Sequence, residues 1–564
     1  MQYRKEILRK NKGLVCFYVC IGLACSLLGN FKASYFQEVV DGLADRSVSL
    51  LQILFYGALL CSVFLLEYLD NYPAKRLEHG FFLDFKLLAL KKISRIDYSE
   101  YQRLGTGKLV QRVENGAEAG RNILFHFWLQ LFPRLIPTAF FSLCFIWRIS
   151  RPVTLGILAG YVIVFLVTNL LLKSLYRIKE KILVNEELLN HFLVRCFMEM
   201  PVFRMARQFF REFQKAEETK EQIVHAKTKM TMIHEAFFTI FALLVAFLNV
   251  GVLLYAWSTG TLSVGAVVAL LSLLDNAYTP VAIFNVLYVQ YKLDRASFRR
   301  YEEFLSAKDD MQLTTGKCLP ACEGNISIHG LSFSYGERQI FHGLNLSIKK
   351  GEKVALVGES GSGKSTLLKL LSGLLKYKEG SIQIDGEDVK LLRLTDLYEK
   401  ISYLSQDSTV FDGSLRENIA FEKKVSEEAL LHAIKEVRLM PWYRTLEHGM
   451  ETSIGERGAV LSGGERQRVA LARLWLEQKG LTILDEATSA LDNLTEKAII
   501  DRILTLLEAH TVIAVTHKLD SAAAFDRIIL FQEGEIVGEG SFSELLRENQ
   551  YFAQLYQANQ QSTD

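Results

Sequence analysis

Nine residues near the middle of the chain have the composition of a phosphate-binding loop. Gly358–Thr366 reads G-E-S-G-S-G-K-S-T, follows a short apolar run that we expect to be a buried strand, and precedes a helical pattern. Glycines allow backbone N–H groups to converge on phosphate oxygens at a helix N-terminus. We expect Lys364 to reach the β and γ phosphates and Ser365 to bind Mg²⁺ through its hydroxyl. The rest of the predicted nucleotide cradle is Gly358, Ser360, Gly361, Ser362, Gly363 and Thr366.

A second apolar strand, predicted over 481–484, ends in two acidic residues. Asp485 at such a strand end can hold Mg²⁺ through water, and the adjacent Glu486 can polarise an attacking water. Acidic residues end many strands, so the pair alone is a weak signal. Together with the phosphate loop, it predicts a site that hydrolyses a nucleoside triphosphate.

A glycine-rich segment, Leu461–Arg468, stands just before that second strand. On physical grounds it is a helix N-cap that could hold an anion, or a plain cap with no ligand. The residues themselves leave both interpretations open.

With these motifs in place, the sequence resembles the ATP-binding cassette exporters over roughly residues 14–558, in the half-transporter arrangement. Leu461–Arg468 matches the signature motif of that family. The resemblance implies that Tyr335 stacks on adenine, that Gln406 senses Mg²⁺ beside the membrane domain, and that His517 contacts the γ phosphate. ATP is then the nucleotide and Mg²⁺ its cofactor.

The resemblance also implies that each ATP site is shared between two chains. Signature residues of one chain would complete the site of a second copy or of a related half-transporter, and residues 455–458 would match an exporter-type loop. The implied catalytic residues are Glu486, His517 and Lys364, the implied metal-binding residues are Ser365, Gln406 and Asp485, and the residues implied to act in trans are Ser462, Gly463, Gly464 and Asp492.

Long uncharged runs in the first half of the chain predict that the nucleotide domain is attached to a membrane domain, because a helix of about 20 apolar residues crosses the hydrocarbon of a bilayer. We expect an all-α domain of six spans over residues 1–305. A linker at 306–324 then leads to an α/β P-loop domain of the ABC ATPase type at 325–564. The six predicted spans are about 13–31, 47–68, 122–147, 152–172, 237–257 and 262–290.

Basic residues predict the orientation of these spans. Residues 70–124 hold ten Lys and Arg, and residues 173–235 hold twelve, whereas the opposite side has few. The chain is therefore predicted to be a multi-pass protein of the cell membrane, with its N-terminus and nucleotide domain in the cytoplasm. The spans should continue as helices into the cytoplasm, interrupted by the polar-aromatic stretches 96–101 and 203–210. These stretches are either exposed hairpin tips or docking contacts, and they resemble the coupling helices of the family.

Two charges fall inside predicted spans, where charge is costly and is usually paired or functional. Arg134 and Asp275 each lie 13 residues from the predicted outer end of a span, so both sit roughly 20 Å below it. They could form a buried ion pair or line one substrate cavity. A third alternative is that one of them snorkels or faces a cytoplasmic vestibule.

The composition limits the class of function. Half of the residues are hydrophobic, yet 23% are charged, which indicates a mosaic of membrane and soluble parts. A net charge of +2 does not suit a nucleic-acid binder that works by bulk charge. We expect ATP-driven export of an unidentified peptide, drug or lipid. Uptake on the same fold, of the siderophore type, and an ATP-gated channel or regulator are the alternatives.

Overall fold

The computed structural model describes residues 2–104, 106–406, 410–421, 423–455 and 461–561. The chain forms two compact units. The first comprises Met1–Ser94 and Leu104–Ala307, and the second comprises Arg95–Arg103 and Lys308–Asp564. The division predicted from the sequence places residues 95–103 in the membrane domain, whereas here they belong to the second unit.

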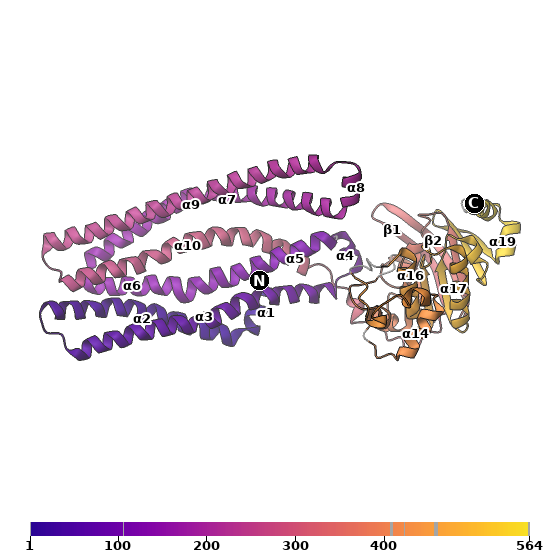
Figure 1. Ribbon diagram of the computed structural model, residues 1–564, viewed down its shortest axis with the longest axis horizontal. Helices are drawn as coiled ribbons and strands as arrows, with labels where there is room; N and C mark the ends of the chain where they lie inside the picture. Colours follow the sequence, from indigo (N-terminus) through magenta and orange to yellow (C-terminus); the bar gives the residue numbers. More distant parts are fainter. Residues whose placement is uncertain (1, 105, 407–409, 422, 456–460, 562–564) are drawn as a thin grey trace. The chain divides into compact units, whose positions relative to one another are not determined.

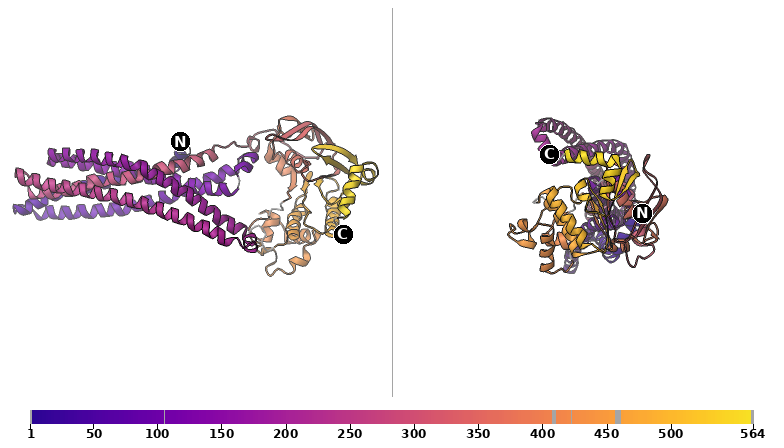
Figure 2. Two further views of the ribbon diagram at one scale, coloured as in Figure 1. Left: turned by 90° about the horizontal axis from the view of Figure 1, so that it is seen from above. Right: turned by 90° about the vertical axis from the view of Figure 1, so that its right-hand side faces the viewer.

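The first unit is built of helices, most of them long (Figures 1 and 2). The chain turns sharply at positions whose residues suit a turn. Ser49 begins α3 with a capping box, Gly260 ends α9 in the left-handed conformation, and Ser263 caps α10. The helices are α1 (Gln2–Lys10), α2 (Lys12–Ala44), α3 (Leu50–Ile93), α5 (Thr106–Arg121), α6 (Ile136–Ile149), α7 (Arg151–Met198), α8 (Met200–Met205), α9 (Phe209–Thr259) and α10 (Val264–Leu305).

Five helical stretches of the described chain are long and apolar enough to cross a membrane: α2, α3, Leu109–Ile149, α9 and α10. They coincide with five of the six predicted spans, although α3 and α10 begin three and two residues after the predicted starts at 47 and 262. The remaining predicted span, 152–172, lies in α7, where the shorter stretch Arg151–Leu166 is apolar. The number of spans therefore stays a prediction.

The third predicted span differs from a regular α-helix. Residues Asn122–Leu129 (η1) and Leu131–Leu135 (η2) are π-helical, and α6 follows directly. Pro133 lies within the second π segment and Pro137 begins the next helix. Proline lacks an N–H and its ring crowds the preceding turn, so the regular ladder of hydrogen bonds cannot continue here.

Helices α7 and α9 run side by side and are joined at their tip by α8 (Figures 1 and 2). The polar-aromatic stretch 203–210 lies in this tip. Large apolar side chains are exposed there, namely Met200, Val202, Met205, Phe209 and Phe210. Its docking role stays a prediction.

The second unit contains two sheets in its described residues. One is antiparallel, in the order β2-β1-β4-β5, and the other runs β10-β9-β3-β8-β7-β6, parallel except for the edge pair β9–β10. The strands are β1 (Ile326–Tyr335), β2 (Arg338–Ile348), β3 (Lys353–Gly358), β4 (Glu379–Ile384), β5 (Glu387–Asp388), β6 (Ile401–Leu404), β7 (Leu481–Asp485), β8 (Thr511–Val515), β9 (Arg527–Gln532) and β10 (Glu535–Gly540).

Helices accompany both sheets of this unit (Figure 1). Strands β3, β7 and β8 are buried along their whole length, as expected for parallel strands covered on both faces. The helices are α4 (Tyr98–Leu104), α11 (Lys364–Leu371), α12 (Leu394–Lys400), α13 (Leu415–Ala420), α14 (Glu427–Glu436), α15 (Met440–Tyr443), α16 (Gly463–Leu476), α17 (Asn493–Leu506), α18 (Leu519–Ala522), α19 (Phe542–Glu548) and α20 (Gln550–Gln561), with 3₁₀ turns η3 (Met311–Leu313) and η4 (Gly449–Glu451).

Candidate nucleotide site

The predicted phosphate loop joins the buried strand β3 to α11, as the sequence pattern indicates. Gly358 and Gly363 have φ angles of +149° and +103°. A Cβ at Gly358 would lie 2.1 Å from the carbonyl oxygen of Phe531, so only glycine fits there. The loop ends at the N-terminus of α11, whose backbone N–H groups favour an anion. Ser360, Gly361 and Ser362 lie in this loop, and Thr366 lies in the first turn of α11.

Lys364 is buried beneath the loop. Its Nζ donates to the carbonyl oxygens of Gly358 at 2.8 Å and of Glu359 at 2.7 Å, and to Oγ of Ser362 at 3.2 Å. Burial lowers the pKa of Lys364, and the carboxylates nearby, led by Glu486, oppose this shift. The ammonium group therefore stands among oxygen acceptors at the place where the phosphates of a nucleotide are expected.

The predicted metal-binding residues Ser365 and Asp485 lie in contact. Oγ of Ser365 donates to Oδ1 of Asp485 at 2.7 Å, and the hydroxyl of Tyr403 donates to Oδ2 at 3.2 Å. Burial raises the pKa of Asp485, and these two hydrogen bonds oppose the shift. Hydroxyl and carboxylate oxygens are ligands that Mg²⁺ prefers, so Ser365 and Asp485 fit that ion. Sequence reasoning missed Tyr403, whose signal was its place on the strand just before Gln406.

Two predicted residues, Gln406 and His517, come from separate segments and contact the carboxylate of a third, Glu486. Nε2 of Gln406 donates to Oε2 of Glu486 at 2.8 Å, and Nε2 of His517 lies 2.8 Å from Oε1. Glu486 follows β7 directly and has a φ of +51°, an unfavourable angle for a side chain with a Cβ. The strained residue is thus held by contacts on both carboxylate oxygens.

Tyr335 ends β1 and keeps 43% of its surface exposed. Phe333 packs edge-on against it, with ring centroids 5.0 Å apart. An exposed aromatic ring that is supported by a neighbouring ring can stack on a planar nucleobase.

The glycine-rich segment caps a helix, as its residues indicate. Ser462 begins α16 with a capping box to Glu465, and it is exposed together with Gly463. The side chain of Gln467 donates to Oγ of Ser489 and accepts from the N–H of Ala490, which joins this helix to the segment that leads to Asp492. Asp492 caps α17 by accepting from the N–H of Thr495 at 2.9 Å. Gly464 also lies at the start of α16, and the predicted loop 455–458 lies largely outside the described residues.

The two charges predicted to lie inside membrane spans, Arg134 and Asp275, have different surroundings. Arg134 forms its ion pair with Asp70 of α3, which is fully buried, and its guanidinium lies 5.4 Å from the ring centre of Tyr18. Asp275 is exposed on α10, and no ion pair or hydrogen bond of it occurs within the described ranges. Of the alternatives left open for these two charges, a direct ion pair is thus not observed, because Arg134 finds its counterion on α3 instead.

Comparison with known proteins agrees with this geometry. Residues 15–279 match the family model of the ABC transporter transmembrane region, and residues 341–489 match that of the ABC transporter. The uncharacterized ABC transporter ATP-binding protein YwjA of Bacillus subtilis is 37% identical over 302 residues, 53% of this chain and 52% of that protein. The ATP-dependent lipid A-core flippase of Francisella tularensis (strain SCHU S4) is 38% identical over 250 residues, 44% of this chain and 41% of that protein.

The matched region thus spans about half the length of these curated relatives. A solved structure of a bacterial Atm1-family ABC exporter with ATP bound superimposes with a TM-score of 0.84 and 23% identity, covering 98% of both chains. This likeness shows the fold, and the apolar helices agree with a multi-pass membrane protein whose ATPase domain is cytoplasmic. The chain belongs to the ABC transporters, with a transmembrane region followed by an ABC ATPase domain in the half-transporter order.

Proposed function

We propose that the protein is an ATP-driven exporter that works as a dimer. One observation carries the proposal: the carboxylate of Glu486 is held by Gln406 and His517 next to a complete phosphate loop. In this arrangement Glu486 accepts a proton from the attacking water, and His517 orients the base. Lys364 neutralises charge that develops on the phosphates.

Mg²⁺ would be held by Ser365, Asp485 and Gln406. When bound, the ion would neutralise negative charge on the phosphates. The protein residues orient the ion: Tyr403 fixes the carboxylate of Asp485, and Ser365 presents its hydroxyl from the first turn of α11.

A second chain is needed in this proposal because the signature residues are exposed. Ser462 and Gly463 lie at the start of α16, a 14-residue helix whose N-terminus favours an anion. Facing the phosphate loop of a partner, they would complete its γ-phosphate site, together with Gly464 and Asp492. The partner is a second copy or a related half-transporter. ATP binds the closed dimer preferentially and shifts the population toward it.

For the substrate, we propose an anionic or zwitterionic molecule. Arg134 keeps 42% of its side-chain surface exposed although Asp70 is fully buried, so part of the guanidinium is available to a carboxylate or phosphate. A lipid with phosphate groups fits this chemistry, and one relative is named as a lipid A-core flippase. Asp275 is exposed on α10, and we propose it as a second cavity residue that would face a cationic group.

Transport into inside-out vesicles tests the direction and the energy source. We expect ATP-dependent accumulation of an anionic lipid or peptide from a panel, and none in vesicles that carry the Glu486→Gln chain. Release from preloaded vesicles on ATP addition would indicate uptake instead. Arg134→Ala should lower the substrate-stimulated ATPase activity and leave the basal activity in place. An unchanged stimulation would remove Arg134 from the substrate site.

A further inference from the structure

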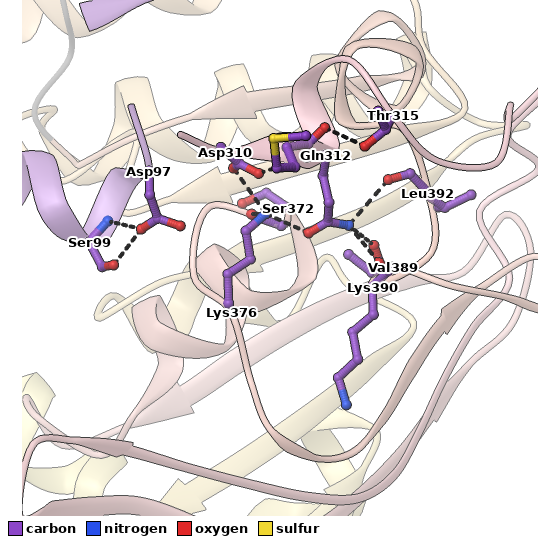
Figure 3. Close-up of polar contacts among 12 residues, drawn as sticks. Asp97, Ser99, Asp310, Gln312, Thr315, Ser372, Lys376, Val389, Lys390 and Leu392 are labelled. Carbon is purple, nitrogen blue, oxygen red and sulfur yellow. Dashed lines mark hydrogen bonds and ion pairs between the residues drawn. The ribbon is translucent and has the colours of Figure 1, made fainter. Parts of the chain in front are cut away.

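The linker between the helical domain and the nucleotide domain pairs with the segment that contains the first polar-aromatic stretch. Asp97 donates its N–H to the carbonyl oxygen of Lys308 at 3.0 Å, and Asp310 donates its N–H to that of Arg95 at 2.7 Å. Ile96 and Asp309 thereby form an antiparallel bridge. Asp97 also accepts from the backbone N–H of Ser99 at 3.0 Å at the start of α4 (Figure 3). The linker and the segment 95–104 are thus joined by backbone hydrogen bonds.

Gln312 fixes the same linker to the nucleotide domain. Its side-chain amide nitrogen donates to three backbone carbonyl oxygens of one loop, at 2.9 Å (Val389), 2.8 Å (Lys390) and 3.2 Å (Leu392), as Figure 3 shows. Lys317 of the linker adds a further contact to this loop, since its backbone N–H donates to the carbonyl oxygen of Leu391 at 2.7 Å. A side chain that satisfies several carbonyls of one loop holds that loop in a single position.

Lys376 lies at the centre of these contacts. Its Nζ lies 3.0 Å from the carboxylate of Asp310, and it donates to Oε1 of Gln312 at 2.7 Å and to the carbonyl oxygen of Gly373 at 3.0 Å (Figure 3). The Asp310 side chain is only 9% exposed, so its pairing is shielded from solvent. One ammonium group therefore uses all three of its donors.

Gly373 connects this cluster to the ATP site. It lies two residues after the end of α11, and α11 begins at Lys364 of the phosphate loop. A continuous path of hydrogen bonds thus runs from the phosphate-loop helix through Lys376 to Asp310, and from Asp310 through the backbone bridge to Arg95. Arg95 follows the end of α3, the second predicted membrane helix, by two residues.

We propose that Lys376, Asp310 and Gln312 are positioning residues that transmit nucleotide binding from the phosphate-loop helix to the segment 95–104 through the linker. None of the three belongs to the proposed nucleotide or metal site. Their effect is to make the coupling segment follow the end of α11, so that ordering of the phosphate loop by ATP also orders the start of α4. The inference rests on the proposed binding of ATP.

Amide hydrogen exchange in the full-length Glu486→Gln protein, with and without Mg-ATP, tests it. The amides of Asp97 and Asp310 are direct reporters, because each forms one bond of the bridge. We expect ATP to slow exchange in residues 358–371 and also in residues 95–104, on the order of 10-fold in each. With Lys376→Met added, the effect of ATP on 358–371 should persist, and its effect on 95–104 should be lost.

Matched variants separate transmission from simple packing. Lys378→Met removes an exposed lysine of the same loop and should leave both ATP effects intact. Lys376→Arg should restore most of the effect, and adding Asp310→Asn to Lys376→Met should change nothing further. An unchanged response of 95–104 in Lys376→Met, or no response there in the parent while 358–371 responds, would overturn the inference alone. No response in either segment of the parent would contradict the proposed function as well.

Discussion

Two buried threonines on neighbouring strands differ in their hydrogen bonds. Thr511 of β8 accepts from the N–H of Gly351 and donates to the carbonyl of Gly324, both at 2.9 Å. Thr482 of β7 is also fully buried, and its hydroxyl has no hydrogen-bond partner among the described residues. Thr482 therefore carries an unpaired hydroxyl in the core, where an aliphatic side chain would bury no polar group.

We therefore expect Thr482→Val to stabilise the protein by about 1 kcal/mol, because it removes a buried polar group that lacks a partner. Thr511→Val should instead destabilise it by about 1–3 kcal/mol, because two backbone groups lose their partner. The thermal unfolding midpoint of the full chain measures both, at about 2–4 °C per kcal/mol for a domain of this size. A lower midpoint for Thr482→Val would show that the hydroxyl is satisfied in solution.

At this scale, motif spacing predicted which residues the fold brings together around the phosphate loop. Lys364, Asp485 and Glu486 lie where the phosphate loop and the second buried strand indicate, since the carboxyl ends of parallel strands share one edge of a sheet. The sequence could not identify Tyr403, because its role depends on β6 lying next to β7. Asp70 was missed because the sequence does not show which carboxylate of a neighbouring helix packs against Arg134.

Among the elements, α17 and the loop after β8 are joined by an ion pair. Lys518, next to His517, lies 2.9 Å from Glu496 of α17 and also donates to the carbonyl of Leu491. The Glu496 side chain is 2% exposed, and it accepts from Thr488 at 3.1 Å. The pair connects the segment that contains His517 to the helix that Asp492 caps.

Lys518→Met should be strongly destabilising, because it leaves a buried carboxylate without its counterion. We expect a loss of about 2–3 kcal/mol, below the value for a fully buried pair, since Lys518 keeps 28% exposure. Adding Glu496→Gln should recover part of the loss, and the melting midpoints of the single and double variants measure this. A double variant less stable than Lys518→Met would indicate that the two side chains do not act as a pair.

Some elements could be predicted from the sequence and others could not. The break between the predicted spans 237–257 and 262–290 and the helix N-cap at Ser462 follow from local residue preferences, and both are observed. The π-helical segments 122–129 and 131–135 depend on how two prolines are accommodated among packed helices, which local patterns do not specify. The bridge between Ile96 and Asp309 joins residues more than 200 positions apart, and only the fold brings them together.

For the whole molecule, the proposal requires two chains that share each ATP site. Lys364→Ala disables the phosphate loop, and Ser462→Arg places a bulky cation at the predicted trans γ-phosphate position. In a homodimer of shared sites, a dimer with one substitution on each chain keeps one intact site. A dimer with both substitutions on one chain and none on the other keeps no intact site.

Nucleotide trapping in differently tagged, co-purified dimers measures this difference. We expect the split dimer to trap ATP and the doubly substituted one to trap almost none. The reverse result would show that each chain builds its own site. A fully active monomer would also exclude the shared arrangement.

The central claim is that Glu486 is the base of an ATPase site whose nucleotide cradle is independent of it. Glu486→Gln tests this most directly, by ATPase activity and nucleotide affinity of the purified full-length protein. Because glutamine keeps the shape and cannot accept the proton, we predict that hydrolysis falls by a factor of about 100 or more. ATP affinity should stay within about threefold, because Lys364 and the loop are untouched. Near-normal hydrolysis by this variant would contradict the account.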